Sequence, residues 1–301
     1  MPNGANISSV GSWPADSTVS PDWVRRYLAF LGVARRAPDA AALAELTRAH
    51  VLTVPFENVT SLLRRRAHAG RPVPPVDADE LLGRWEQGRS GGVCFEVADL
   101  FGRLLAALGY RVHPVLGYIT FPGSHQALLV QMGDARLLVD VGNGAPFFEP
   151  IPLREAVEIR RAGLAYRFRP DVATGDWIQE RLIDGAWAPF CRYALRQPDP
   201  AAFEAAYQRH HTPGETWVTG SLTIIRCEEE QVVLLRDEEL SHFSTAGKRS
   251  ERISTLADYA RVAAETFKLP ALPIAEGAGA WRETIARWGG PHAPPPLARE
   301  V

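Results

Sequence analysis

A single cysteine behind a glycine pair is the first feature of the sequence that could do covalent chemistry. Gly91 and Gly92 precede Cys94, and Cys94 opens an apolar pattern of helical spacing that runs to Tyr110. A thiol at a helix N-terminus faces the positive end of the helix dipole, which favours the thiolate over the thiol. Because the thiolate is the nucleophile, the pattern predicts a nucleophilic cysteine. The alternative is a buried structural cysteine.

A histidine and an aspartate lie downstream on two predicted strands. The strands, 125–130 and 136–141, are joined by a tight turn at Gly133. A turn centred between positions 132 and 133 places His125 directly opposite Asp140, and a turn centred between 133 and 134 places it one diagonal away. Either loop has an even number of residues, and strand side chains alternate, so both side chains lie on one face.

These three side chains are the set that nucleophilic catalysis needs. Asp140 can fix the tautomer of the imidazole, and His125 can then take the proton from Cys94. The alternative is a surface histidine near a turn and an aspartate that merely ends a strand.

Four motifs carry a resemblance to a known family. They are Gly91-Gly92-Val93-Cys94-Phe95-Glu96, His125, the run from Val139 to Gly144, and Val54-Pro55-Phe56-Glu57-Asn58. In this order they resemble the arylamine N-acetyltransferase family, and the looser likeness extends over roughly residues 20–270. The resemblance implies a papain-like core in which Cys94, His125 and Asp140 form a catalytic triad. It also implies that the cysteine carries an acetyl group from coenzyme A to an aromatic amine or hydrazine.

The chain departs from the family pattern at three positions. Ser90 stands where the family usually has an arginine that pairs with the carboxylate of Glu57. Either Arg89 takes over this pairing or Glu57 finds another donor, because a buried unpaired carboxylate is costly. Ala98 replaces an asparagine. Asn143 replaces a phenylalanine that normally lines the acceptor pocket, which predicts a pocket with smaller and more polar walls.

The predicted function is therefore that of an enzyme, an acyltransferase. It passes an acyl group from a thioester, acetyl-CoA or a similar one, through an acyl-cysteine to an arylamine or other amine. We expect no bound cofactor, with the acyl thioester as co-substrate and a small-molecule amine as partner. We expect these residues to contact the substrate: Phe56, Val93, Phe95, Asn143 and Gly144.

Three alternatives remain open at this point. The first is an amide synthase or macrolactam-forming enzyme that takes a polyketide or peptide thioester from an acyl carrier protein. The second is a relative that only binds ligand, and the third is a cysteine hydrolase.

Composition excludes several other classes of protein. Lys plus Arg number 33 against 35 Asp plus Glu, which gives no basic footprint for nucleic acid or an acidic membrane. No apolar run approaches a membrane span. The three cysteines suit a reduced, cytoplasmic setting.

No histidine has metal-ligand spacing, so we predict no metal, and we expect the pair His210-His211 to lie on the surface.

The elements that must position these residues predict an α+β fold. It comprises an N-terminal helical bundle, a central antiparallel β-barrel and a C-terminal α/β lid, although strand spacing alone suggests either a barrel or a sandwich. The family resemblance implies that the catalytic core is papain-like. Within this fold, we expect a strand over 216–226 and a solvated face at 64–66. The predicted divisions are a disordered tail 1–20, a helical domain 21–110 carrying the nucleophile, a barrel 111–211, a lid 212–285 and a Pro-rich tail 286–301.

Overall fold

Helices form the first part of the chain in this computed structural model, which describes residues 21–288. Five of them precede the first long strand: α1 Pro21–Leu31, α2 Ala40–Thr53, α3 Val59–Ala67, α4 Ala78–Glu86 and α5 Cys94–Ala107. The predicted helical start of the fold is confirmed, and α3 is an addition to it. The predicted tails over 1–20 and, past Trp288, over 289–301 lie outside the described residues.

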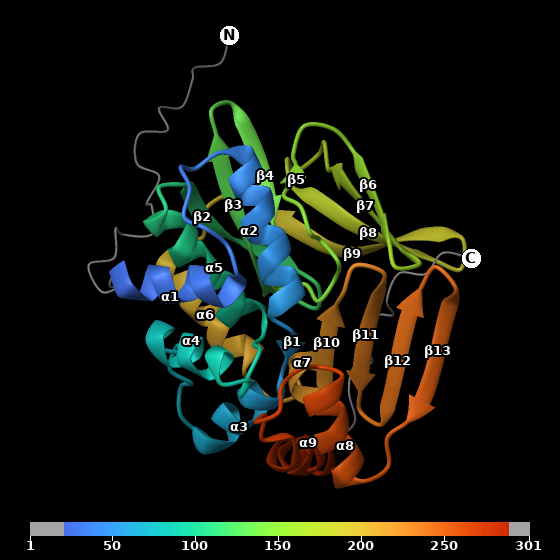
Figure 1. Ribbon diagram of the computed structural model, residues 1–301. Coiled ribbons are helices and arrows are strands. Elements are labelled where there is room, and N and C mark those ends of the chain that lie inside the picture. The colour runs from blue at the N-terminus through green and yellow to red at the C-terminus, as the bar shows by residue number, and fades with distance from the viewer. Residues whose placement is uncertain (1–20, 289–301) are drawn as a thin grey trace.

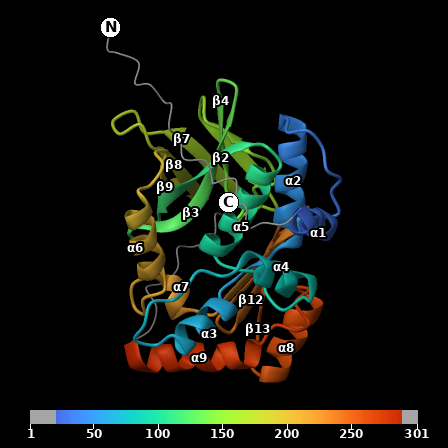
Figure 2. The same cartoon turned by 90° about the vertical axis from the view of Figure 1, so that its left-hand side faces the viewer.

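Eight antiparallel strands then curve into a nearly closed barrel (Figure 1). They are β2 Arg111–Tyr118, β3 Pro122–Met132, β4 Ala135–Val139, β5 Ile151–Pro152, β6 Val157–Arg161, β7 Leu164–Pro170, β8 Trp177–Ile183 and β9 Ala186–Ala194. Their order in the sheet is β5-β4-β3-β2-β9-β8-β7-β6. The predicted antiparallel barrel is thus confirmed. Helix α6, Pro200–His210, follows it and lies against β3 (Figure 2).

Helix α5 is the element that joins the helices to the barrel. It packs on β2 and β3, and its core side chains are at most 2% exposed: Leu100, Phe101, Leu104 and Leu105. The helix ends at Ala107, earlier than the predicted Tyr110, and Gly109 turns the chain away with φ of +94°. Cys94 is therefore the first residue of a helix that the core holds rigidly.

The hairpin of β3 and β4 adopts the second of the two predicted registers. Met132 pairs with Ala135, so the turn consists of the two residues between them. The last pair of the β3–β4 ladder joins Leu128 to Val139, and continuing this register puts Asp140 one diagonal from His125. Both side chains lie on the same face of the sheet, as a loop with an even number of residues requires.

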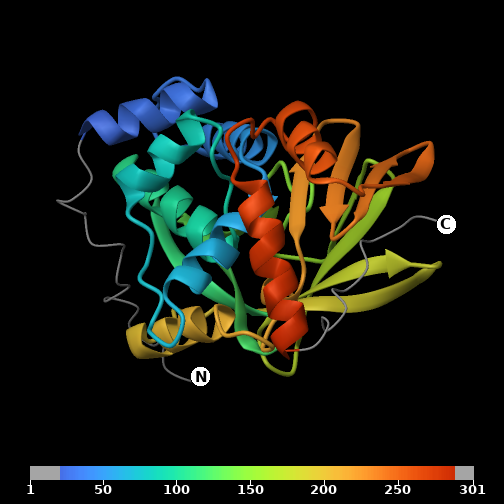
Figure 3. The same ribbon diagram turned by 90° about the horizontal axis from the view of Figure 1, so that it is seen from below.

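A second antiparallel sheet has five strands, four of them from the C-terminal part of the chain (Figure 1). Its order is β1-β10-β11-β12-β13, with β1 Phe56–Glu57, β10 Thr223–Cys227, β11 Gln231–Arg236, β12 Glu239–Ser244 and β13 Gly247–Arg252. Helices α8 Leu256–Glu265 and α9 Ile274–Trp288 pack together, and α9 also packs against α3 (Figure 3). In residues 21–288, no helix combines the length and the apolar character needed to cross a bilayer.

The predicted strand over 216–226 is wrong in its first half. Trp217–Gly220 form the short helix α7, and β10 begins only at Thr223. The Asn58 side chain explains the difference: its Nδ2 donates to two carbonyl oxygens of this turn at 2.7 and 2.6 Å. Its Oδ1 accepts from the Thr223 N–H at 2.8 Å. A distant side chain satisfies these backbone groups, and local periodicity cannot reveal that.

The short strand β1 ties the cysteine loop to the C-terminal sheet. Phe56 pairs with Ile225 of β10, and the Glu57 N–H donates to the carbonyl oxygen of Gly92 at 3.1 Å. A Cβ atom on Gly91 would lie 1.9 Å from the carbonyl oxygen of Pro55. Only glycine allows this approach, which accounts for the first residue of the glycine pair.

Glu57 is fully buried and bonds to a donor other than Arg89, which is the second of the two alternatives given for this residue. Its carboxylate accepts from the N–H and the hydroxyl of Thr60 at 3.0 and 2.5 Å. Within residues 21–288 no arginine or lysine forms an ion pair with it, and Arg89 instead donates to Gln87. Burial raises the pKa of Glu57 from its ordinary 4.5 to about 7, against the opposing effect of the Thr60 bonds.

This carboxyl should make stability fall as pH rises from about 4.5 to 7. In that range the folded protein still binds a proton at Glu57 that the unfolded chain has released. The free energy of unfolding therefore falls by on the order of 3 kcal/mol by neutral pH. Glu57→Gln lacks this titration. Relative to the wild type, the variant should therefore have a higher denaturant midpoint at pH 8 than at pH 5. Parallel wild-type and variant profiles would contradict the assignment.

Candidate active site

Cys94 lies buried at the start of α5, under the loop that follows β4. The Glu96 carboxylate accepts from the Val93 N–H at 3.1 Å and forms an ion pair with Arg64. The prediction of a solvated face is wrong for Arg64, whose side chain is 14% exposed because this ion pair draws it inward. A Cβ atom on Gly142 would lie 2.6 Å from Cα of Cys94, so glycine lets the two backbones touch.

The structure brings His125 and Asp140 together on the adjacent sheet. His125 Nε2 lies 2.9 Å from Asp140 Oδ2, and each residue is 2% exposed. Gly117 of β2 is paired with His125, and a Cβ there would lie 3.0 Å from Cβ of His125. A glycine on the neighbouring strand therefore leaves room for the imidazole.

Cys94 and His125 border the same pocket, so the three predicted residues lie together. Burial alone would lower the pKa of His125, but attraction to Asp140 and to Cys94 raises it to about 10. Since Nε2 is bound to Asp140, Nδ1 is the ring nitrogen left for the sulfur. The charged imidazolium is consequently the stable form beside Cys94 at neutral pH.

Two further side chains hold Asp140. The Tyr193 hydroxyl donates to its Oδ2 at 2.7 Å, and the Asn143 amide donates to the same oxygen at 2.9 Å. Gln179 Oε1 accepts from the Asn143 amide at 3.1 Å. Asn143 is thus bound to the buried carboxylate as well as bordering the pocket. Sequence reasoning missed Tyr193 and Gln179, because they lie on β9 and β8 and no local pattern marks them.

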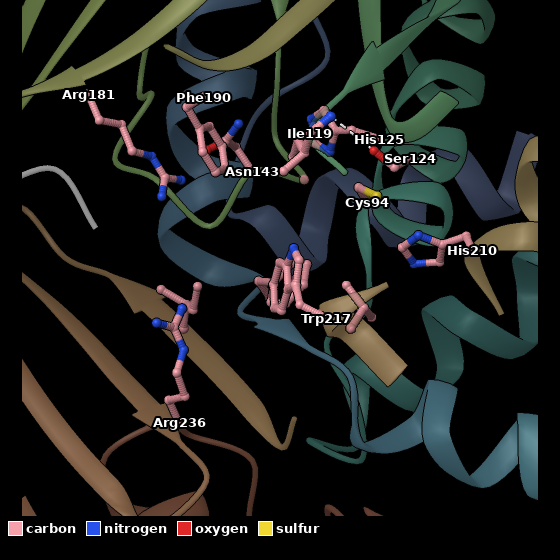
Figure 4. Close-up of a pocket in the computed structure, with 14 residues that line it drawn as sticks. Cys94, Ile119, Ser124, His125, Asn143, Arg181, Phe190, His210, Trp217 and Arg236 are labelled. Carbon is pink, nitrogen blue, oxygen red and sulfur yellow. Dashed lines mark hydrogen bonds between the residues drawn. The ribbon is translucent and has the colours of Figure 1, made fainter. Parts of the chain in front are cut away.

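A pocket opens beside the sulfur (Figure 4). Phe56 and Trp217 line one wall with ring centroids 5.9 Å apart, and Phe190 lines another. The remaining lining residues are Cys94, Ile119, Ser124, His125, Gly142, Asn143, Arg181, His210, Val218, Ile225 and Arg236. The pocket therefore combines aromatic walls with two arginines.

Of the five residues expected to contact substrate, Phe56 and Asn143 line this pocket. Val93 is fully buried in the main core. Phe95 faces the other side of α5, where it packs against rings of α6. Gly144 has φ of +71° and supports the pocket wall from behind, since a Cβ there would lie 2.6 Å from Ile225.

The prediction that His210 and His211 lie on the surface is wrong. They are 1% and 3% exposed, because α6 packs its last turn against β3. The His210 ring lies 5.0 Å from that of Phe95 and borders the pocket near Cys94. Burial lowers the pKa of His210 well below its ordinary value, and the charge of His125 adds to this.

Across residues 21–288, no three His, Cys, Asp or Glu side chains gather as metal ligands.

Known proteins resemble this chain in sequence. The sequence model of the N-acetyltransferase family matches residues 39–272. An arylamine N-acetyltransferase of Mycolicibacterium smegmatis is 29% identical over 233 residues, which cover 71% of this chain and 80% of that protein. Proansamycin X synthase of Amycolatopsis mediterranei is 31% identical over 158 residues, or 50% of this chain and 58% of that protein.

A solved structure shows the same fold. It is that of Mycobacterium marinum arylamine N-acetyltransferase in complex with CoA, with a TM-score of 0.72 and 20% identity, covering 88% of this chain and 98% of that one. The predicted papain-like α+β fold is confirmed by this likeness.

The hydrogen bond from Tyr193 to Asp140 offers a test of the site. Tyr193→Phe should slow alkylation of Cys94 by iodoacetamide roughly tenfold, because a buried carboxylate that orients the imidazole loses a charge-assisted bond. The matched control is Tyr166→Phe, since Tyr166 is equally buried in the barrel and its hydroxyl has no hydrogen-bond partner among the described residues. Equal rates for both variants would show that Tyr193 does not position the site.

Proposed function

The chain belongs to the arylamine N-acetyltransferase family and is an acetyltransferase, and we propose that Cys94 carries the acyl group between a thioester and an amine. One observation carries this proposal. Cys94, at the start of α5, interacts with a buried imidazole whose far nitrogen is hydrogen-bonded to Asp140 at 2.9 Å. That arrangement supplies a nucleophile, a proton carrier and a group that orients the carrier.

In the first half of the cycle the thiolate of Cys94 attacks the carbonyl carbon of the acyl thioester. A new S–C bond forms, and the carbonyl becomes an oxyanion that backbone N–H groups at the start of α5 stabilise. The oxyanion collapses, the C–S bond to the leaving thiol breaks, and the His125 imidazolium gives that thiol its proton. The products are acyl-Cys94, neutral His125 and the free thiol.

The second half returns the enzyme to its starting state. Acylation removes the thiolate charge that helps hold the proton on His125, so the pKa of His125 falls and the ring can act as a base. The amine nitrogen attacks acyl-Cys94 and gives its proton to His125. The thiolate leaves, and the amide product is released.

The pocket walls support an aromatic amine as acceptor and a small acyl group. Phe56, Trp217 and Phe190 offer apolar ring surfaces beside Cys94. Acetyl-CoA is the donor that the family membership favours, and the M. marinum relative was solved in complex with CoA. Both substrates are small molecules that use the pocket in turn.

A second candidate is amide synthesis on a thioester held by a carrier protein. The likeness to proansamycin X synthase over half of this chain favours it. The same Cys94 would accept the acyl chain, so donor identity separates the two candidates. Acylation of Cys94 by a carrier-bound thioester but not by acetyl-CoA would select the synthase.

The proposal predicts that acetyl-CoA adds one acetyl group to Cys94, with a burst of free CoA equal to the enzyme concentration. Asp140→Asn should slow this burst by roughly 10³-fold, because the imidazole loses its orienting partner. Intact-mass measurement and peptide mapping locate the group. Cys227→Ala, at a buried cysteine in β10 away from the pocket, is the control that should remain acylated. A Cys94 mass that never shifts would exclude acetyl-CoA as donor.

The raised pKa of His125 predicts how this ring titrates. The imidazolium persists up to about pH 10, so the ring resonances of His125 in an NMR titration should not shift between pH 6 and pH 9. An unperturbed histidine would instead titrate near pH 6.5. In Asp140→Asn the attraction that raises the pKa of His125 is lost, and the titration should move towards that ordinary value. A wild-type His125 that titrates near pH 6.5 would contradict its pairing with Asp140.

A further inference from the structure

A second imidazole borders the pocket beside Cys94. His210 is the last residue of α6, and Figure 4 shows its ring projecting into the pocket, with the Cys94 side chain between it and the ring of His125. Cys94, His125 and His210 are 3%, 2% and 1% exposed, so all three side chains are almost completely shielded from solvent. The acyl-transfer cycle proposed for this protein uses only the first two.

Close packing of α6 on the strand that carries His125 places this ring. Gly123 of β3 has φ of +86°, and a Cβ atom there would lie 2.8 Å from Cβ of Ala206. Ala206 in turn belongs to an apolar cluster that contains Cys94. His210 follows Ala206 by one helical turn and therefore lies on the same face of α6. The same packing thus holds His210 and the nucleophile next to one another.

The two ring nitrogens of His210 lack hydrogen-bond partners. Both are buried, and neither forms a hydrogen bond of normal geometry within residues 21–288. The neighbouring His211 differs, because its Nδ1 bonds to the carbonyl oxygen of Tyr207 at 2.8 Å. A buried polar group without a partner is costly and uncommon in folded proteins. Since the ring of His210 lines a pocket, a bound molecule is the expected source of that partner.

The surroundings of His210 keep its ring neutral. Burial lowers the pKa of His210 well below its ordinary value, and the charges of His211 and His125 lower it further. The Asp140 carboxylate is bonded to His125 instead. A neutral imidazole has a proton on one nitrogen, which the Ser124 backbone attracts here, and a lone pair on the other. His210 can therefore accept a hydrogen bond at neutral pH.

The second half of acyl transfer needs an acceptor of this kind. A primary amine that attacks acyl-Cys94 carries two N–H bonds, and its nitrogen becomes positively charged as the N–C bond forms. His125 takes one proton, and the remaining N–H needs an acceptor in a site that is shielded from water. Ser124 Oγ already accepts from the N–H groups of Ile119 and Thr120 at 2.9 and 3.0 Å.

One other side chain of the lining offers an unpartnered acceptor. Asn143 Oδ1 has no hydrogen-bond partner within residues 21–288, but the amide of Asn143 is bonded to Asp140. In Figure 4 Asn143 lies across the pocket from His210, with Cys94 between them. His210 is thus the acceptor beside the sulfur that is not already engaged in orienting His125.

We propose that His210 is a further substrate-binding residue, which accepts a hydrogen bond from the amine as the amine attacks acyl-Cys94. This rests on the proposed function and assigns His210 to its second half-reaction. The amine nitrogen forms the N–C bond, gives one proton to His125 and keeps the other, which is directed at His210. The C–S bond then breaks, and the thiolate of Cys94 leaves. Acylation of Cys94 by a thioester involves no amine, so it does not require His210.

The experiment measures the two half-reactions separately. Acylation is followed as the burst of 4-nitrophenol from 4-nitrophenyl acetate, which acylates Cys94 without coenzyme A. Transfer is followed by mixing the acyl-enzyme with aniline. His210→Phe keeps a ring that packs on Phe95 and removes both nitrogens. It should slow transfer to aniline by roughly tenfold or more, because an N–H is left without an acceptor, and should leave the acylation burst within about twofold.

A comparison of two amines distinguishes a direct contact from a structural role. N-methylaniline has a single N–H, which goes to His125, so His210→Phe should slow its transfer much less than that of aniline. His210→Gln keeps an acceptor and should restore part of the aniline rate. The matched control is His211→Phe, since His211 is equally buried but is not among the residues that line the pocket. Both of its half-reactions should be unchanged, and thermal unfolding checks that each variant folds.

The outcomes separate failure of this assignment from failure of the proposed function. Unchanged transfer to aniline in His210→Phe would overturn the role of His210 and leave the transferase intact. Equal slowing of both amines, or slowing of acylation as well, would show that His210 acts only through packing. A wild-type acyl-Cys94 that hydrolyses but never reacts with an amine would overturn the proposed transfer itself, and the role of His210 with it.

Discussion

The buried carboxylate of Asp140 is the constraint on which the rest of the structure depends. A carboxylate at this depth is tolerated only if several donors share its charge, and His125, Tyr193 and Asn143 supply them at 2.9, 2.7 and 2.9 Å. These donors come from β3, β9 and the loop after β4. By bringing these strands together, the barrel keeps the Asp140 carboxylate away from water beside Cys94.

The second constraint is close approach of backbones around Cys94. Gly142 touches the cysteine from one side, and Gly91 allows the cysteine loop to press against Pro55 from the other. The β1 strand then couples this loop to β10. Cys94 is held between the helical part, the barrel and the C-terminal sheet.

The sequence allowed correct prediction of features that depend on local spacing. The helix that begins at Cys94 follows from apolar periodicity, and the shared face of His125 and Asp140 follows from strand alternation whichever turn is chosen. Features that depend on tertiary partners could not be predicted. Helix α7 exists where Asn58 caps a distant turn, and His210 is buried because α6 happens to pack on β3. Arg181 and Arg236 have nothing in their local sequence to place them in one pocket.

The pairing of β1 with β10 also bears on how the chain acquires its structure during synthesis. Phe56 and Glu57 leave the ribosome long before Ile225 and Ile224, their respective partners in the sheet. The cysteine loop therefore cannot take its final position until most of the polypeptide has been translated. Until β10 has been synthesised, Cys94 lies in an incompletely assembled environment.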